Sequence, residues 1–471
     1  MQKINLILRT PTITTWLKII SLVMFILLII IGLSANSSDS AFLKELRNTN
    51  LANLIVWSYW WPIIIITAIF FGRLWCMVCP VELITTIASK LGLRNKRPRW
   101  ILSGWAITIF YILILFIGIE GFAIHRNPTY MAIYLLSIIA VSVITGLVWE
   151  KNTFCRYFCP VGYLLGIYSR LSFLGWRVKS QSICSSCKDK SCIHKNYTYN
   201  IDKKSCGVDL YPAQISDNSN CILCAGCAKS CSQYQTVKIN ERPNPQLVKI
   251  GFANDLFKVK PLKYAEMFFV MVVSGFVISE IWSEWKTTDN LLKIIPDLII
   301  EKFSINIHFL EVLISSTIIF IIYPLILWLL PYFISQLVGL KLKLKDYLLN
   351  YGIAFIPIIA AAHLDKAILK MTSRLPYFQY LFDDVSGMKT TPNIIEHKIT
   401  LFQMPFWFNF LVSVAISFIM LIGIYLSFKT IKLINKKYSY NNTESKPIYS
   451  LSAIYGSVFL IMLLAWKWIN F

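Results

Sequence analysis

Residues 221–231 read Cys-Ile-Leu-Cys-Ala-Gly-Cys-Ala-Lys-Ser-Cys, which places four cysteines in the spacing C-x2-C-x2-C-x3-C. A tight loop lets the first three thiolates converge on one polynuclear iron–sulfur centre, and a short helix after it carries the fourth thiolate away. Tetrahedral zinc sites also use C-x2-C units, but zinc does not explain a third cysteine placed so close. The stretch therefore favours a 4Fe–4S cluster, and zinc is the alternative.

A second, looser group of cysteines precedes this stretch. Bacterial ferredoxins with two clusters bind each one through three cysteines of one run and the last cysteine of the other. On that crossed pattern one cluster is held by Cys184, Cys187, Cys192 and Cys231, and the other by Cys206, Cys221, Cys224 and Cys227. Residues 176–262 are thus expected to form a small ferredoxin-like α+β domain with two 4Fe–4S clusters. Ser232 stands where the usual pattern has proline.

The rest of the chain is too apolar for a soluble protein. Hydrophobic residues make up 56% and charged residues 15%, against about 25% charged residues in soluble domains. A span needs about 20 apolar residues. Nine such stretches occur, at 16–35, 53–72, 101–122, 130–149, 264–283, 309–331, 348–368, 407–428 and 449–469. The predicted fold is an all-α polytopic membrane protein of about nine transmembrane helices with the ferredoxin-like domain inserted.

Three consecutive domains follow from this pattern. Residues 1–175 are expected to form an N-terminal membrane domain of four spans, residues 176–262 the iron–sulfur domain, and residues 263–471 a C-terminal membrane domain of about five spans.

Lysines and arginines indicate how the chain lies in the membrane. If the N-terminus is inside, the inner segments are 1–18, 73–99, 150–263, 336–347 and 429–448, and they hold 34 of the 46 basic residues. This is the positive-inside pattern. It predicts a multi-pass protein of a prokaryotic plasma (inner) membrane, with the N-terminus and ferredoxin domain cytoplasmic and the C-terminus outside. Cytoplasmic cysteines favour metal ligation over disulfides.

The net charge of +22 has the same explanation. Basic residues that flank apolar segments contact membrane lipid, and the sequence contains no nucleic-acid-binding motif, so a nucleic-acid partner is not expected.

Two apolar stretches end in a cysteine pair that closes on proline. The pairs are Cys76 and Cys79, before Pro80, and Cys155 and Cys159, before Pro160. Each is followed by a stretch of helical periodicity, which indicates two related helical hairpins. Four thiolates at equivalent ends of these hairpins suit a third cluster at the membrane boundary. The alternatives are redox-active thiols without a cluster and buried structural cysteines.

Membrane spans that end in Cys-Pro pairs, followed by a two-cluster ferredoxin segment, resemble the NapH/NosR-type membrane-bound 4Fe–4S ferredoxin family. The resemblance covers about residues 50–240 and includes Gly162 after the second Cys-Pro. It implies electron transfer between a quinone pool and a redox partner protein. The first pair has two residues between its cysteines where the family usually has three, and the C-terminal spans lie outside the matching part.

Ionisable residues within spans are functional candidates. His363 lies in the seventh span, and we interpret it as a candidate for a quinone site. Haem ligation together with His308 is an alternative. Tryptophans at the span edges, Trp57 and Trp61 among them, are interpreted as interfacial anchors.

Two functions remain open at this stage. The first is an electron-transfer component that passes electrons between quinol and a partner, without being a stand-alone enzyme. The second is an assembly, maturation or transport protein that uses its clusters to reduce a metal. Histidine- and methionine-rich metal-handling motifs would favour the second, and the sequence has none, so the first is preferred.

Overall fold

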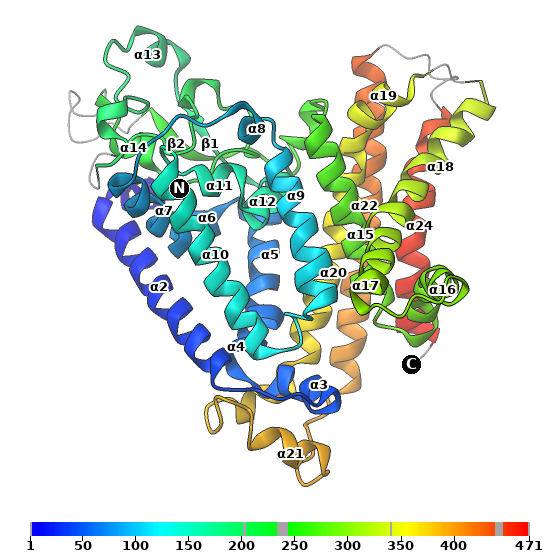
Figure 1. The fold of residues 1–471 in the computed structure, drawn as a ribbon. Coiled ribbons are helices and arrows are strands. Elements are labelled where there is room, and N and C mark those ends of the chain that lie inside the picture. The colour runs from blue at the N-terminus through cyan, green and yellow to red at the C-terminus, as the bar shows by residue number, and fades with distance from the viewer. Residues whose placement is uncertain (1, 201–203, 233–243, 340–341, 439–445, 470–471) are drawn as a thin grey trace. The chain divides into compact units, whose positions relative to one another are not determined.

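The computed structural model describes residues 2–200, 204–232, 244–339, 342–438 and 446–469 (Figure 1). Helices dominate these residues, and their one sheet has two strands. The chain divides into two compact units, each built from separate stretches of sequence. Unit 1 comprises Met1–Ile30, Ile66–Ile107 and Ala132–Asp255, and unit 2 comprises Ile31–Ile65, Thr108–Met131 and Leu256–Phe471. The three consecutive domains expected from the sequence stay a prediction.

Unit 1 holds all twelve cysteines. Its helices and strands, some of which extend into the other unit, are α1 (Gln2–Arg9), α2 (Pro11–Leu33), α5 (Trp61–Phe71), α6 (Leu74–Val78), α7 (Pro80–Leu91), α8 (Arg99–Leu102), α10 (Pro128–Val148), α11 (Thr153–Tyr157), α12 (Pro160–Tyr168), β1 (Leu174–Val178), α13 (Gln181–Ser186), α14 (Gly226–Lys229) and β2 (Pro245–Lys249).

The expected internal repeat is visible in this unit. Helix α5 leads through the five-residue helix α6 into α7, and α10 leads through the five-residue helix α11 into α12. Proline is the first residue of both α7 and α12, where its missing N–H has no helical partner to lose and its fixed φ suits the first turn. The two cysteine-proline motifs therefore adopt the same local structure.

The segment after α12 is rich in loops and contributes one antiparallel pair of strands. Strand β1 pairs antiparallel with β2, in a register that sets Trp176 opposite Leu247. Both side chains are buried in a small core with Cys221 and Cys227. At the N-terminus Asn5 exchanges two hydrogen bonds with the backbone of Leu247, which ties α1 to the edge of this sheet.

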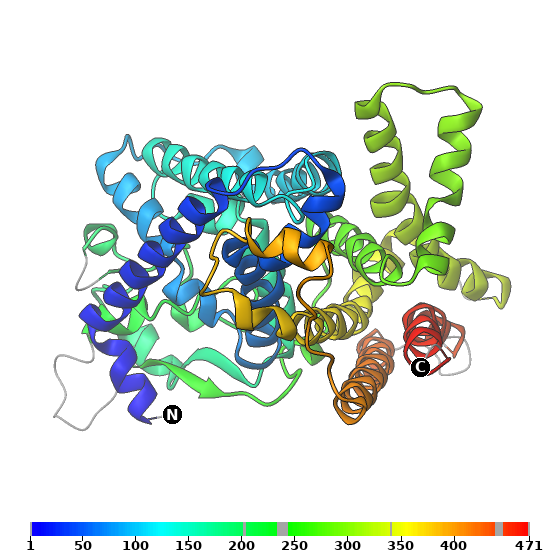
Figure 2. The same ribbon diagram turned by 90° about the horizontal axis from the view of Figure 1, so that it is seen from below.

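The regular secondary structure of unit 2 consists of helices in the residues that the structure describes. Its elements are α3 (Ser40–Thr49), α4 (Leu51–Leu54), α9 (Trp105–Leu113), α15 (Tyr264–Trp282), α16 (Lys286–Lys302), α17 (His308–Thr317), α18 (Tyr323–Leu337), α19 (Leu344–Asp346), α20 (Ile356–Ser373), α21 (Thr390–Ile395), α22 (Phe406–Lys437) and α24 (Ser450–Leu464), with π-helical turns at Ile55–Trp60, Ile114–Gly121, Ile318–Ile322, Tyr347–Tyr351 and Ala465–Ile469. Helices α16 and α17 pack side by side, as Figure 2 shows in yellow-green.

Helix α20 forms the core of unit 2. It packs against α15, α22 and α24, and most of its residues are buried. Gly423 of α22 allows the closest approach, because a Cβ there would lie 2.5 Å from the Cβ of Ala361. A buried helix in a membrane unit is where polar side chains can be sheltered from lipid.

The structure confirms the all-α polytopic fold. Among the described residues, eight helices are long and apolar enough to cross a membrane: Thr12–Leu33, Leu51–Phe71, Pro128–Val148, Tyr264–Trp282, His308–Leu337, Leu344–Ser373, Phe406–Lys437 and Lys446–Trp468. They correspond to eight of the nine expected spans. The remaining one, expected at 101–122, appears as the shorter apolar helix Trp105–Gly121.

Candidate iron–sulfur sites and a polar cavity

The four cysteines at the ends of the hairpins form one group, which we call the boundary group: Cys76, Cys79, Cys155 and Cys159. Cys76 lies within α6 and Cys155 within α11, whereas Cys79 and Cys159 are the N-cap residues of α7 and α12. The first turns of these helices direct backbone N–H groups at sulfur. The N–H of Gly162 lies 3.3 Å from Cys159 Sγ, and Val81 and Glu82 donate in the same way to Cys79.

The boundary thiols are close to one another and removed from water. Burial is the largest cause that raises the pKa of Cys155, and nearby Glu82 and the other three thiols of the group raise it further. Burial likewise raises the pKa of Cys159 to about 11. Buried thiols that lie so close together suit ligands that bound iron would deprotonate.

A middle group consists of Cys206, Cys221, Cys224 and Cys227. Burial raises the pKa of Cys221 to about 12, with smaller contributions from Cys224 and Cys206 nearby. Trp176 Nε1 donates a 2.9 Å hydrogen bond to Cys227 Sγ. The backbone N–H of Leu210 donates to Cys206 Sγ at 3.3 Å. Hydrogen bonds to sulfur are one means by which proteins set the potential of a cluster.

A distal group consists of Cys184, Cys187, Cys192 and Cys231, which line one cavity. Burial is the largest cause that raises the pKa of Cys192 to about 12. The nearby thiols of Cys231, Cys184 and Cys187 raise it as well. Asn244 Nδ2 donates to Cys184 Sγ at 3.0 Å. The structure therefore brings the cysteines together in the two crossed sets expected from their spacing, together with the boundary group.

Two contacts connect the three groups in a line. The guanidinium of Arg73, which is 4% exposed, lies near both Cys159 and Cys221 and counteracts the burial that raises the pKa of each thiol. Arg73 thus lies between the boundary and middle groups. The backbone N–H of Cys206 donates to the carbonyl of Cys192 at 2.9 Å, which joins the middle group to the distal group.

Glu82 forms a buried charged centre beside the boundary group. Its carboxylate is paired with Lys18 and Lys204 and accepts a 2.5 Å hydrogen bond from Asn152 Nδ2. Burial opposes its ionisation, but the two ammonium groups outweigh burial and lower the pKa of Glu82. The four residues come from α2, α7, the turn before α11 and the loop before Cys206. Glu82 therefore joins the parts of unit 1 that carry the cysteines.

The donor sets fit 4Fe–4S clusters better than zinc. Each group supplies four thiols, which is the complement of one cubane. The thiolates of a cubane bind four different irons, so they stand further apart than the ligands of one ion. In the described ranges no three His, Cys, Asp or Glu side chains are close enough to hold a single metal ion.

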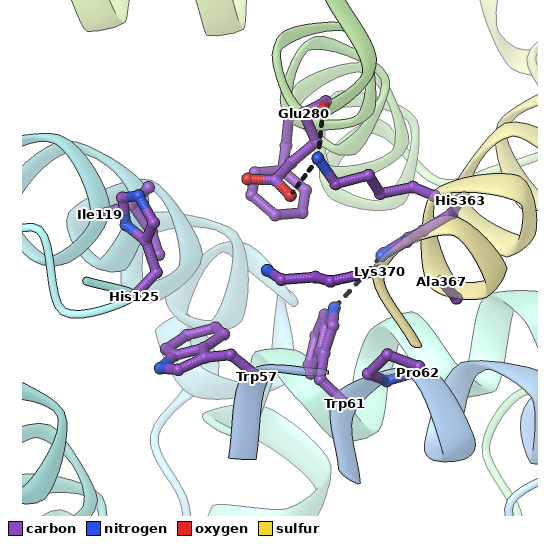
Figure 3. A pocket seen from close by; sticks show the side chains of 11 residues that line it. Trp57, Trp61, Pro62, Ile119, His125, Glu280, His363, Ala367 and Lys370 are labelled. Atoms are coloured by element: carbon purple, nitrogen blue, oxygen red, sulfur yellow. Dashed lines mark hydrogen bonds and ion pairs between the residues drawn. The ribbon is translucent and has the colours of Figure 1, made fainter. Parts of the chain in front are cut away.

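Unit 2 contains a cavity around the predicted residue His363 (Figure 3). His363 is 4% exposed, and its Nε2 accepts a 3.3 Å hydrogen bond from Trp61 Nε1. Lys366 lies 3.4 Å from the carboxylate of Glu280 and also pairs with Glu284. His308 is exposed and pairs with Glu311, so it does not join His363 in this cavity. Trp57 and Trp61 line the cavity, a role that their interpretation as interfacial anchors did not include.

A protein-family model described as "4Fe-4S binding domain" matches residues 53–99 and 131–183. These stretches contain both Cys-Pro pairs and end immediately before Cys184. The match supports an iron–sulfur protein of the ferredoxin type with an electron-transfer role. Together with its apolar helices it describes a multi-pass membrane iron–sulfur protein.

Two similar proteins come from Methanocaldococcus jannaschii. The uncharacterized protein MJ0750 is 24% identical over 193 residues, which is 36% of this chain and 74% of the relative. The uncharacterized protein MJ0749 is 22% identical over 178 residues, 36% of this chain and 66% of the relative. No solved structure matches.

Several residues of these sites were not predicted from the sequence. In the sequence, Arg73 and the lysines around Glu82 look like the many other basic residues of the inner segments, so nothing distinguishes them as site residues. Nothing in the sequence indicates that Trp176 donates a hydrogen bond to a cysteine sulfur, because that contact depends on the register of β1 with β2. Glu82 could have been found, since it is an acid three residues after Cys79, at the start of a largely apolar helix.

Proposed function

We propose that the protein is a membrane-bound electron carrier of the NapH/NosR type that passes electrons between the quinone pool and a redox partner protein. The observation that supports this proposal is the arrangement of its cysteines in three groups of four, connected in a line through Arg73 and the Cys192–Cys206 contact. When bound, 4Fe–4S clusters accept and release single electrons.

Three clusters follow from the same proposal. The distal and middle groups hold the two clusters of the ferredoxin segment, and the boundary group holds the third. The family match supports the third cluster, because its two stretches include the boundary pairs and exclude the other eight cysteines. The N–H groups at the first turns of α7 and α12 stabilise negative charge on the boundary sulfurs.

The membrane side remains part of the proposal. We place the N-terminus and the ferredoxin segment in the cytoplasm, on the basis of the basic residues in the inner segments. Lys96 is exposed and lies in the inner segment 73–99, away from the cysteines in the sequence, so a reporter there tests the side. A biotin ligase acceptor peptide inserted after Lys96 should be biotinylated in the cytoplasm of intact cells. Labelling by an external enzyme alone would contradict the orientation.

Iron and sulfide analysis tests the cluster count on anaerobically purified protein. We expect about twelve irons and about twelve sulfides per chain, with EPR signals from reduced 4Fe–4S clusters. About eight irons would exclude the cluster at the boundary group, and stoichiometric zinc would exclude the proposal. Addition of a reduced quinol under anaerobic conditions should then bleach the visible absorbance of the clusters, and a lack of bleaching would contradict the quinone link.

The hydrogen bond from Trp176 to Cys227 gives a further prediction. Substitution Trp176→Phe removes an N–H that stabilises the reduced, more negative cluster. A hydrogen bond of about 1 kcal/mol corresponds to a fall of roughly 40 mV in the potential of the middle cluster. An EPR-monitored redox titration measures this fall in the reduction potential. Trp100→Phe, at an exposed tryptophan of the same unit, serves as the control and should leave all potentials unchanged.

A further inference from the structure

The cavity in unit 2 contains hydrogen-bond donors that have no acceptor. Trp57 Nε1 and His125 Nδ1 are buried without a hydrogen-bond partner in the part of the chain that the structure describes. Lys370 extends across the cavity (Figure 3). Its described side-chain contact is with the face of Trp57, 5.9 Å from the ring centroid. Unpaired buried polar groups cost free energy, so two of them in one cavity, beside the Lys370 ammonium group, point to a ligand that accepts hydrogen bonds.

The protonation of His125 makes it a donor as well. Arg126 Nε donates to His125 Nε2 at 3.0 Å, so Nε2 is the acceptor atom of the ring. Burial lowers the pKa of His125 to about 3, so the ring is neutral and carries its one proton on Nδ1. The two unsatisfied atoms, Trp57 Nε1 and His125 Nδ1, are therefore both N–H donors, as is the ammonium group of Lys370.

The acid in the cavity is already paired. Glu280 has Lys366 as its partner, and Lys366 also donates to the Glu280 carbonyl at 2.5 Å and pairs with Glu284. Lys370 has no such carboxylate within ion-pair distance among the described residues. The cavity thus presents N–H donors and one ammonium group that has no carboxylate in direct contact among the described residues, and it suits a ligand that accepts hydrogen bonds through oxygen.

The volume of the cavity and the side chains that line it limit which ligands can bind there. Its volume of about 20 Å³ admits one water molecule or a single oxygen atom of a larger ligand. Apolar and aromatic side chains complete the walls: Trp61, Pro62, Ile119 and Phe276. Oxygen acceptors on a flat apolar ring match this combination of aromatic walls and N–H donors.

We propose that this cavity receives a carbonyl oxygen of a quinone, with Lys370 as the principal donor and Trp57 and His125 as the others. This inference rests on the proposed function and assigns it a binding site. It also changes the role of His363. Because His363 Nε2 already accepts from Trp61, His363 is a positioning residue that fixes the Trp61 wall. Because Trp57, His125 and Lys370 are donors and Glu280 is engaged by Lys366, we expect the site to bind quinone more tightly than quinol, whose hydroxyl groups need acceptors.

Binding to the cluster-loaded full-length protein in detergent tests the proposal. The probe is 2,3-dimethyl-1,4-naphthoquinone, measured by isothermal titration calorimetry. Lys370→Met should weaken binding about tenfold or more, because it removes a charged hydrogen-bond donor. Lys370→Arg should retain most of the affinity, and Trp57→Phe should lose less than Lys370→Met. The control is Lys293→Met, an exposed residue of the same unit that pairs with Asp289, and it should bind as the wild type does.

Two further measurements separate the outcomes. An unchanged melting temperature of Lys370→Met shows that the variant is folded, and equal quinone affinity in Lys370→Met and wild type would then overturn the inference. Displacement of the quinone by inorganic phosphate or by phosphatidylglycerol at similar concentration would also overturn it, since the site would then be a phosphate site. Failure of the proposed function looks different: the quinone binds in a Lys370-dependent manner, but its quinol does not reduce the clusters.

Discussion

Replacing Glu82 by alanine is expected to destabilise unit 1 by about 3–5 kcal/mol, because it leaves two largely buried ammonium groups without their counter-ion. Lys18 and Lys204 are 12% and 14% exposed beside a carboxylate that is 3% exposed. Water cannot replace the carboxylate at such positions. For a unit of this size the change corresponds to a fall of about 10 °C in the apparent melting temperature, which differential scanning fluorimetry of the loaded protein in detergent would measure.

Two variants sharpen this test. Glu82→Gln keeps an oxygen for Asn152 and the lysines but removes the charge, so its melting temperature should fall between those of Glu82→Ala and wild type. Glu150 forms a more exposed pair with Arg97, at 3.4 Å, and pairs of that kind contribute less than about 1 kcal/mol. Glu150→Gln should therefore melt close to wild type. If Glu82→Ala did so too, Glu82 would not be the centre that joins the cysteine-bearing segments.

The sequence predicted those parts of the sites that depend on short-range spacing. Cysteines two to four residues apart must lie on one loop, and proline after a cysteine starts a helix there, so the grouping of the thiols and the two matching turns could be inferred. The crossed pairing of Cys206 with Cys221 followed from the bacterial pattern, and the structure brings these cysteines together.

The unpredicted parts depend on contacts between distant segments. His363 stood out because a histidine in a span is unusual, but its partner Trp61 is 302 residues away in the chain. Lys370 lies two turns further along the same helix. The same argument would have identified it as a functional candidate, since it is an ionisable residue in a span. Trp57 and His125 come from separate segments, and only the packing of unit 2 shows that they line one cavity.

Helix α16 shows a different limit of sequence-based prediction. Its residues Lys286–Lys302 carry charges at helical spacing, which favours an amphipathic helix, but Pro296 in the interior argues against a continuous helix. In the structure it packs beside α15 and α17. Its formation depends on these neighbours, which a local pattern does not contain.

The substitution Cys155→Ser is expected to remove one complete cluster, so that iron falls from about twelve to about eight atoms per chain. Cys155 lies in α11 within the boundary group, near the other three thiols, and a serine hydroxyl is a much poorer ligand for iron at neutral pH. The clusters of the middle and distal groups should remain, because their eight cysteines lie in the separate loop-rich segment. Iron and sulfide analysis, together with EPR of the dithionite-reduced protein, measures both expectations.

A paired variant shows whether the loss is specific. Cys184→Ser removes a ligand of the distal group, where the sulfur lies beside Asn244, and should lose about four irons with the boundary signal unchanged. The electron-transfer consequences should differ as well. A carrier whose groups are connected in line through Arg73 needs the boundary cluster to receive electrons from quinol, so Cys155→Ser should abolish quinol-dependent bleaching while dithionite still reduces the remaining clusters. Normal iron content in Cys155→Ser would mean that the boundary cysteines are structural, and the two Cys-Pro turns would then serve only to dock the ferredoxin segment on the membrane helices.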